Sequence, residues 1–283
     1  MKKKAFGASG IELPVIGQGT WNLPESGAKL KEAQRAIRRG IELGMTHLDT
    51  AEMYGAGRVE ELLGEAIRGI PRDKLFITTK VLPGNATYDG TLRAAEGSLQ
   101  RLGLEYVDLF LLHWPGSHPL EATMRAFDEL VESGKARFVG VSNFEVAEMA
   151  EAASYLRRAR IACNQVLYHL CERGIEHEVL PEAKRRGIAV VGYTPFGRGA
   201  YLRKAARSRE VLERVARKHA ATVAQVALAF LTRDPALFTI PKAARVEHVE
   251  ENAGAGELEL DGQEIAAIDA AFPRGERGAL ATL

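Results

Sequence analysis

Short apolar runs alternate with longer amphipathic segments along the whole of this chain. The short runs are rich in β-branched and aromatic residues, which is typical of buried strands. The pattern predicts eight strands, near Val15–Gly17, Thr46–Asp49, Leu75–Lys80, Val107–Leu112, Phe138–Val141, Ile161–Gln165, Ile188–Tyr193 and Phe238–Ile240.

The longer segments carry apolar residues three or four positions apart, as helices with one buried face do. Several are followed by glycine, which is well suited to end a helix. We expect helices over Leu30–Leu43, Val59–Arg68, Leu92–Leu102, Leu120–Ser133, Val146–Arg157, Ile175–Arg186, Val223–Thr232 and Gly262–Ala271.

Eight such strand-and-helix units predict an α/β fold, a (β/α)8 TIM barrel, because parallel neighbours need helical crossovers and eight tilted strands close a ring. The alternative is an open doubly wound sheet, which usually carries a G-x-G-x-x-G turn after its first strand. The glycine pairs of this chain lack a third glycine in register, at Gly17/Gly19, Gly55/Gly57 and Gly197/Gly199. The barrel is therefore preferred.

Two segments depart from the even spacing. Lys4–Phe6 and Ile11–Leu13 flank a glycine-bounded turn and predict an N-terminal β-hairpin that closes the bottom of the barrel. The interval between the seventh and eighth strands is the longest, so extra helices are expected there and at the C-terminus. No linker-like composition interrupts the chain, and residues 1–283 are expected to form a single domain.

The composition is that of an ordinary globular protein, with 46% hydrophobic and 27% charged residues and a net charge of +1. This balance suggests neither a nucleic-acid partner nor a membrane span. The N-terminal segment lacks the apolar core of a signal peptide. Two cysteines, Cys163 and Cys171, are too few for a disulfide framework. We expect a cytoplasmic protein, with a monomer as the default state.

Polar side chains stand at the ends of three predicted strands. Asp49 ends the second strand, Lys80 ends the third and His113 follows the fourth, while Tyr54 lies in a glycine-bounded loop after Asp49. Catalytic groups of such barrels stand at the C-terminal ends of the strands. Asp49 alone would fit a helix N-cap or a structural ion pair. The interpretation as a catalytic site therefore depends on all four residues together.

Together these residues would form a proton-donating unit. A tyrosine hydroxyl titrates near pH ~10 unaided, and a neighbouring ammonium can make it more acidic. An adjacent Asp keeps the Lys charged, and a neutral His N–H can orient a carbonyl oxygen on which negative charge develops. This chemistry suits hydride transfer to a C=O group.

The segment Leu48–Gly55 resembles the D-T-A-x-x-Y-G signature of the aldo-keto reductase family. Later blocks resemble the family in the same order, and the resemblance covers nearly the whole chain: Leu111–Pro115, Gly140–Phe144, Asn164–Val166 and Ile240–Lys242. It implies an NAD(P)H-dependent oxidoreductase that reversibly reduces small aldehydes and ketones to alcohols. Tyr54 would be the general acid, tuned by Lys80 and Asp49. His113 would orient the substrate carbonyl.

The resemblance also implies a cofactor, NADPH, extended across the barrel mouth. Ser142, Asn143 and Gln165 would bind the nicotinamide carboxamide, and Tyr193 would stack on the nicotinamide ring. Further cofactor contacts are expected from Gly19, Thr20, Trp21, Asp49, Thr194, Pro195, Phe196, Gly197, Gly199 and Ile240.

The site for the 2′-phosphate follows the last strand. Lys242 and Arg245 suit a phosphomonoester. His248 stands where many members of the family have Arg, so NADH is possible but less favoured. Glu251 and Asn252 resemble the pair that contacts adenine in this family.

The substrate pocket is expected to be lined by Trp21, Tyr54, Leu82, His113 and Trp114. The segment after the last predicted helix is short, which predicts an open site of broad specificity.

Other functions remain as alternatives. A cofactor-binding regulatory or sensor subunit with little turnover is one, because relatives that serve as channel subunits share the fold. A zinc site is another, since Cys163, His169, Cys171 and His177 lie close in sequence, but the close ligand pairs of such sites are missing. We therefore expect no metal.

Overall fold

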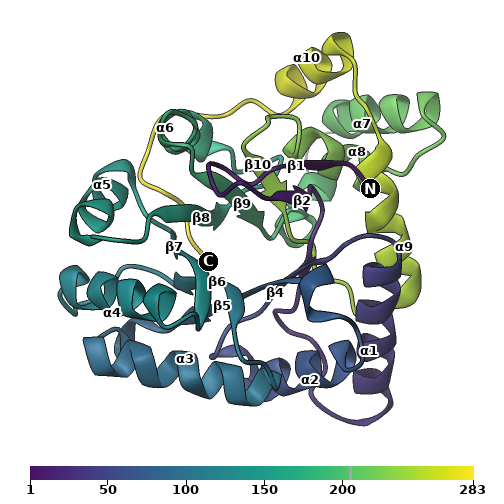
Figure 1. The fold of residues 1–283 in the computed structure, drawn as a ribbon. Helices are drawn as coiled ribbons and strands as arrows, with labels where there is room; N and C mark the ends of the chain where they lie inside the picture. Colours follow the sequence, from purple (N-terminus) through teal and green to yellow (C-terminus); the bar gives the residue numbers. More distant parts are fainter. Residues whose placement is uncertain (204–205) are drawn as a thin grey trace.

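The computed structural model describes residues 1–203 and 206–283, and its core is a parallel barrel (Figure 1). Neighbouring strands pair in the order β10-β9-β8-β7-β6-β5-β4-β3. Two parallel bridges, Ile16 with Thr239 and Gly19 with Lys242, join the first strand segment to the last and close the ring. The predicted (β/α)8 fold is confirmed. The strands are β3 (Gln18–Gly19), β4 (His47–Asp49), β5 (Phe76–Val81), β6 (Val107–Leu112), β7 (Ala136–Ser142), β8 (Ile161–Leu167), β9 (Ala189–Tyr193) and β10 (Leu237–Thr239).

The first barrel strand differs from its prediction at Val15–Gly17. Regular strand structure is limited to β3, and the predicted residues instead run beside β10 as a less regular segment. Thr239 donates its N–H to the carbonyl of Val15 at 3.0 Å, and Gly17 donates to the carbonyl of Thr239 at 2.8 Å. This first segment of the barrel pairs with β10 through some of its residues and with β4 through others. It therefore forms no long regular ladder with either strand.

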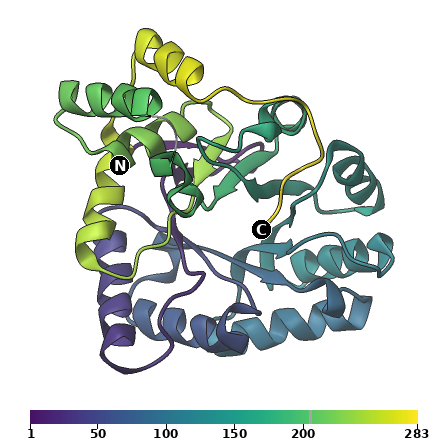
Figure 2. The same ribbon diagram turned by 180° about the vertical axis from the view of Figure 1, so that it is seen from behind.

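Helices surround the barrel in both ribbon views (Figures 1 and 2). They are α1 (Gly27–Glu42), α2 (Arg58–Ile67), α3 (Tyr88–Leu102), α4 (Leu120–Glu132), α5 (Val146–Tyr155), α6 (Val179–Arg186), α7 (Ala206–Lys218), α8 (Val223–Leu231), α9 (Val246–Gly254) and α10 (Gly262–Ala271). The extra helices expected after the seventh strand and at the C-terminus are α7 and α10.

Some helices begin at other residues than the apolar pattern predicted, because local interactions determine where they start. Helix α3 starts before its predicted residue because the Thr87 hydroxyl caps it, accepting the N–H of Gly90 at 3.0 Å. Helix α6 starts later than predicted because Gly174–Glu176 forms a separate 3-10 turn. Helix α9 has no counterpart among the predicted ranges.

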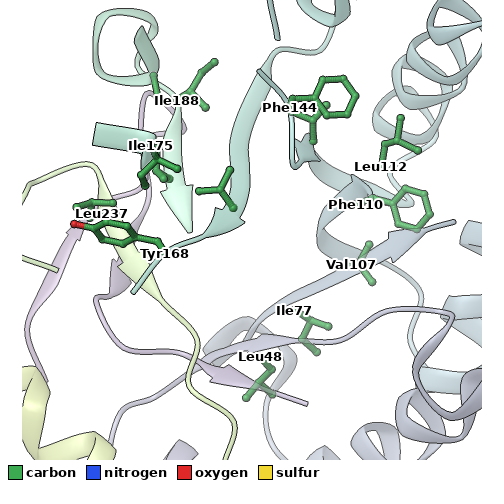
Figure 3. Close-up of a cluster of buried hydrophobic side chains, with 14 of the residues drawn as sticks. Leu48, Ile77, Val107, Phe110, Leu112, Phe144, Tyr168, Ile175, Ile188 and Leu237 are labelled. Carbon is green, nitrogen blue, oxygen red and sulfur yellow. The ribbon is translucent and has the colours of Figure 1, made fainter. Parts of the chain in front are cut away.

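Side chains alternate between two cores along the strands. Phe110 and Leu112 of β6 point outward into the layer between barrel and helices, where Figure 3 draws them. Leu109 and Leu111 point inward and belong to the core inside the barrel. The next inward position is His113, so the period of the strand aims this side chain at the barrel axis.

The predicted N-terminal hairpin is present, as β1 (Lys3–Ala5) and β2 (Glu12–Pro14) paired antiparallel. Phe6 of its turn has no exposed surface. Its ring packs against Phe76 at 5.3 Å and Phe238 at 5.2 Å between ring centroids. The hairpin thus closes the bottom of the barrel, as predicted.

Residues 273–283 leave α10 and run back across the molecule. Both ribbon views show this yellow segment passing α6 and α5 and ending over the middle of the ring (Figures 1 and 2). The Leu280 N–H donates to Glu145 Oε1 at 2.6 Å. This contact holds the segment against the end of the barrel that carries the site.

Across residues 1–203 and 206–283, every helix is too short or too polar to cross a membrane.

Candidate active site

A buried ion pair lies at the C-terminal ends of β4 and β5. Lys80 Nζ donates to Asp49 Oδ1 at 2.6 Å and to the carbonyl of Thr50 at 2.7 Å. Lys80 is fully buried and Asp49 is 2% exposed. The other carboxylate oxygen, Asp49 Oδ2, accepts from Gln165 Nε2 at 2.7 Å. Both oxygens of Asp49 are therefore engaged, which holds the pair in one geometry.

The Tyr54 side chain lies beside this ion pair. The loop after β4 turns sharply at Tyr54–Gly57, where Gly55 and Ala56 have left-handed φ angles of 56° and 51°. Lys80 Nζ is 5.2 Å from the centroid of the Tyr54 ring. The structure thus brings together the Tyr and Lys that the sequence singled out.

Burial and charge set the protonation states of this pair. Burial alone would lower the pKa of Lys80, but Asp49 and Tyr54 outweigh it and the pKa is raised, so the ammonium persists at neutral pH. Burial raises the pKa of Tyr54, and the charge of Lys80 opposes that rise. Lys80 acts in the expected direction, but burial has the larger effect. The hydroxyl keeps its proton, as a general acid must before it reacts.

His113 faces Tyr54 across the site, with the two ring centroids 5.8 Å apart and the rings in an edge-to-face arrangement. Burial, followed by the positive charge of Lys80, lowers the pKa of His113 to about 2. Its Nδ1 is buried and has no hydrogen-bond partner within the described part of the chain. A neutral imidazole beside a tyrosine hydroxyl can donate an N–H to an oxygen on which charge develops.

Further polar side chains meet at the ends of β7, β8 and β9. Asn143 Nδ2 donates to the carbonyl of His113 at 3.2 Å and to Ser142 Oγ at 3.1 Å. The Tyr193 hydroxyl donates to Asn143 Oδ1 at 2.8 Å. Asn143 Oδ1 has a second lone pair, so it can accept an N–H from a carboxamide while it keeps the bond from Tyr193. Gln165 gives its amide nitrogen to Asp49, which leaves its carbonyl oxygen to accept from a ligand.

These groups line a cavity of about 260 Å³. Most of the residues predicted for cofactor or substrate contact border it: Gly19, Thr20, Trp21, Asp49, Tyr54, His113, Trp114, Ser142, Asn143, Gln165, Tyr193, Thr194, Ile240 and Lys242. Sequence reasoning missed Met53 and Leu283, which also line it, and Arg198 borders it from the loop 194–199, which was expected to contact the cofactor. An open site was expected because the segment after the last predicted helix is short. The structure shows that this segment nevertheless reaches the cavity, where Leu283 forms part of its wall.

The other predicted site residues do not border this cavity. Leu82 is one of them, and its N–H donates to Glu52 Oε1 at 2.6 Å. The remaining ones are Pro195, Phe196, Gly197, Gly199, Arg245, His248, Glu251 and Asn252. Their roles toward a ligand stay predictions.

Cations gather at the N-terminus of α9. Arg245 immediately precedes the first residue of this helix, and its guanidinium contacts Nε2 of His248 in the first turn. Lys242 lies just upstream, where it borders the cavity. Exposed N–H groups of a helix N-terminus together with Lys and Arg side chains suit a phosphate group.

The cysteines and histidines weighed as zinc ligands have other contacts. Cys163 belongs to the apolar core inside the barrel. His169 Nδ1 accepts the N–H of Cys171 at 3.2 Å, and the His177 ring meets the carbonyl of Gly275. Among the residues that the structure describes, no three metal-ligating side chains gather closely enough to hold an ion.

A closed parallel barrel that sets a protonated tyrosine and a neutral histidine over a buried Lys–Asp pair defines an oxidoreductase of the aldo-keto type. The aldo/keto reductase family model matches residues 15–272, and the chain belongs to this family. It is 42% identical over 274 residues to methylglyoxal reductase YeaE of Escherichia coli (strain K12), covering 96% of each chain. It is 36% identical to glyoxal reductase of Bacillus subtilis (strain 168), covering 93% of this chain and 90% of that protein.

Solved structures agree with these relationships. The aldo/keto reductase of Klebsiella pneumoniae in complex with NADP and acetate superposes with a TM-score of 0.93. It is 39% identical, and the match covers all of both chains. A second Klebsiella pneumoniae structure, in complex with NADPH, matches equally well.

Proposed function

We propose that this protein reduces small aldehydes and ketones to alcohols, with NADPH as the hydride source, in a reversible reaction. The observation that carries the proposal is the placement of Tyr54 between His113 and the Lys80–Asp49 pair at the open end of the barrel. Bound NADPH supplies the hydride.

Side chains of the protein would supply the proton that the carbonyl oxygen needs and stabilise the charges that form. Tyr54 donates its hydroxyl proton to the carbonyl oxygen, and the adjacent Lys80 ammonium stabilises the phenolate that remains. Asp49 keeps Lys80 charged and in place. His113, being neutral, orients the carbonyl oxygen through an N–H and stabilises the charge that grows there.

The residues present fit NADPH. Ser142, Asn143 and Gln165 offer donors and acceptors for the carboxamide where they border the cavity, beside the flat ring of Tyr193. The cations at the N-terminus of α9 would bind the 2′-phosphate, which NADH lacks. The Klebsiella pneumoniae relatives crystallised with NADP and NADPH support this choice, with NADH less favoured.

The substrate would enter between aromatic side chains. Trp21 and Trp114 border the cavity and are 36% and 37% exposed. The relatives named methylglyoxal and glyoxal reductases support a small carbonyl compound. We further propose a monomer working in the cytoplasm; the small number of cysteines supports a reducing compartment.

Steady-state assays with a panel of small aldehydes and ketones, run with NADPH and NADH in parallel, test this function. We expect several carbonyl compounds to be reduced, and kcat/KM to be higher with NADPH because the cations near α9 match its extra phosphate. Cofactor binding without turnover of any carbonyl would contradict the enzyme assignment and favour a sensor. Equal rates with NADH would contradict the phosphate site.

A further inference from the structure

The loop that carries Tyr54 has an unusual backbone. Three successive residues, Gly55, Ala56 and Gly57, have left-handed φ angles of 56°, 51° and 92°. Ala56 carries a side chain, and residues other than glycine rarely adopt this conformation. Strained backbone of this kind persists only where the surrounding structure holds it in place. The contacts of this loop therefore decide how precisely the Tyr54 hydroxyl is placed.

Arg101, near the end of α3, packs against the last residue of this loop. A Cβ atom added to Gly57 would lie 2.6 Å from Arg101 Cδ and 2.8 Å from Arg101 Nε, so the arginine side chain lies directly against the glycine. Gly57 is buried and immediately precedes the first residue of α2. The arginine side chain thus covers the point at which the tyrosine loop joins α2.

A buried carboxylate in the first turn of α2 fixes this arginine. Arg101 Nε donates to Glu60 Oε2 at 2.6 Å, and Glu60 has no exposed surface. The other carboxylate oxygen, Glu60 Oε1, accepts from the Thr79 hydroxyl at 2.6 Å. Thr79 immediately precedes Lys80 in β5 and is also fully buried. One carboxylate therefore connects the arginine, the start of α2 and the strand that carries Lys80.

We infer that the Arg101 network, formed by Arg101, Glu60 and Thr79, positions the catalytic tyrosine. One end of the network bears on the tyrosine loop and the other on the strand next to Lys80, so it fixes these two partners relative to each other. Its side chains do not border the cavity, and they act through the tyrosine. The inference rests on the proposed function, because it concerns proton delivery. A displacement of about 1 Å can slow such a step about 100-fold.

The test compares Arg101→Met with the wild-type protein, using the carbonyl compound of the panel that the wild-type protein reduces fastest. Methionine removes the cation that Glu60 fixes, so the tyrosine loop loses its restraint. We expect kcat per NADPH-binding site to fall about 10-fold, while KM and the Kd for NADPH, measured by fluorescence titration, stay close to the wild-type values. Arg101→Lys keeps a methylene group against Gly57 and a cation for Glu60, and it should restore most of kcat.

A second readout separates positioning from stability. The network acts on proton transfer, so the ratio of kcat in H2O to kcat in D2O should be larger in Arg101→Met than in the wild-type protein. An arginine that only stabilises the fold would lower the unfolding midpoint and leave this ratio and the kcat of the folded protein unchanged. Arg101→Met combined with Glu60→Gln leaves no unpaired buried charge, and it should show the same loss of kcat even if the single variant does not fold.

Arg93→Met is the matched control, because it removes an exposed arginine from the same helix and should leave kcat and the isotope ratio unchanged. Wild-type kcat in the folded Arg101 variants would overturn the inference. A loss of kcat with an unchanged isotope ratio, or with weaker NADPH binding, would indicate a general distortion of the site and overturn it as well. If the wild-type protein reduces no compound of the panel, the proposed function fails and the inference falls with it.

Discussion

Lys80 keeps its charge at a fully buried position because its ammonium donates to Asp49 and to the carbonyl of Thr50. A strand that ends in an inward lysine needs such a partner, since an unpaired buried charge is strongly destabilising. This is why the sequence indicated Lys80 so clearly. Arg198, by contrast, stands in a loop without periodicity, so no pattern could show that it contacts Trp21.

The low pKa of His113, about 2, predicts how the reduction depends on pH. Because burial and Lys80 keep the imidazole neutral, its protonation should not affect kcat/KM between about pH 5 and pH 8, where an ordinary histidine titrates. The measurement is the pH profile of reduction by the wild-type protein and by His113→Gln. An acid limb near pH 6.5 that appears only in the wild-type profile would show that His113 titrates there and contradict this account.

At the scale of elements, the strands were predicted better than the helix ends. The sequence placed His113 directly after the strand that is β6, and the two-residue period of this strand puts His113 on the inner face after Leu109 and Leu111. The start of α3 depends on the side chain of Thr87, and that of α6 on a separate 3-10 turn. Helix α9 is mostly polar, with few buried apolar positions, so its periodic signal was too weak to predict it.

A buried polar network joins the loop after β8 to Arg233, which follows the end of α8. Glu176 Oε1 accepts from the Tyr168 hydroxyl at 2.6 Å and from Arg233 Nη2 at 2.9 Å, and Oε2 accepts from Arg173 Nη2 at 2.8 Å. Arg173 also donates to the carbonyl of Phe272 at the end of α10. The network fixes the point from which residues 273–283 turn toward the cavity.

Glu176→Gln should destabilise the fold by about 3 kcal/mol at pH 7, because it removes the buried carboxylate that Arg173 and Arg233 share and leaves them only the half-exposed Asp269 as a counter-charge. Burial would raise the pKa of Glu176, but hydrogen bonds from Arg173 and Tyr168 and the charge of Arg233 lower it to about 2. A lowered pKa means that the carboxylate stabilises the fold above its ordinary pKa of 4.5 and that this is lost as pH falls toward 2.

Urea unfolding at several pH values checks this prediction. The difference between the wild-type protein and Glu176→Gln should shrink as pH falls below about 4.5. Glu129→Gln, on the exposed side of α4, is the control and should change stability little. A difference that is the same at pH 7 and pH 3 would show that the charge of Glu176 does not stabilise the fold.

At the scale of the whole molecule, closure of the barrel gathers side chains that are far apart in sequence. Gln165 meets Asp49 across 116 positions of the chain because both stand at the same end of the ring. The order of the motifs along the chain predicted that both residues belong to one site, but it did not predict the hydrogen bond between them. The path of residues 273–283 was not predictable, because it depends on tertiary contacts such as that between Leu280 and Glu145.

The central claim is that the Tyr54 hydroxyl delivers the proton in carbonyl reduction, and Tyr54→Phe tests it most directly. The variant keeps the ring beside Lys80 but has no proton to donate, so kcat for an aldehyde should fall by about 10²- to 10⁴-fold while the Kd for NADPH stays the same. Tyr155→Phe, at the surface of α5, should behave like the wild-type protein. Turnover close to the wild-type rate in Tyr54→Phe would contradict the account.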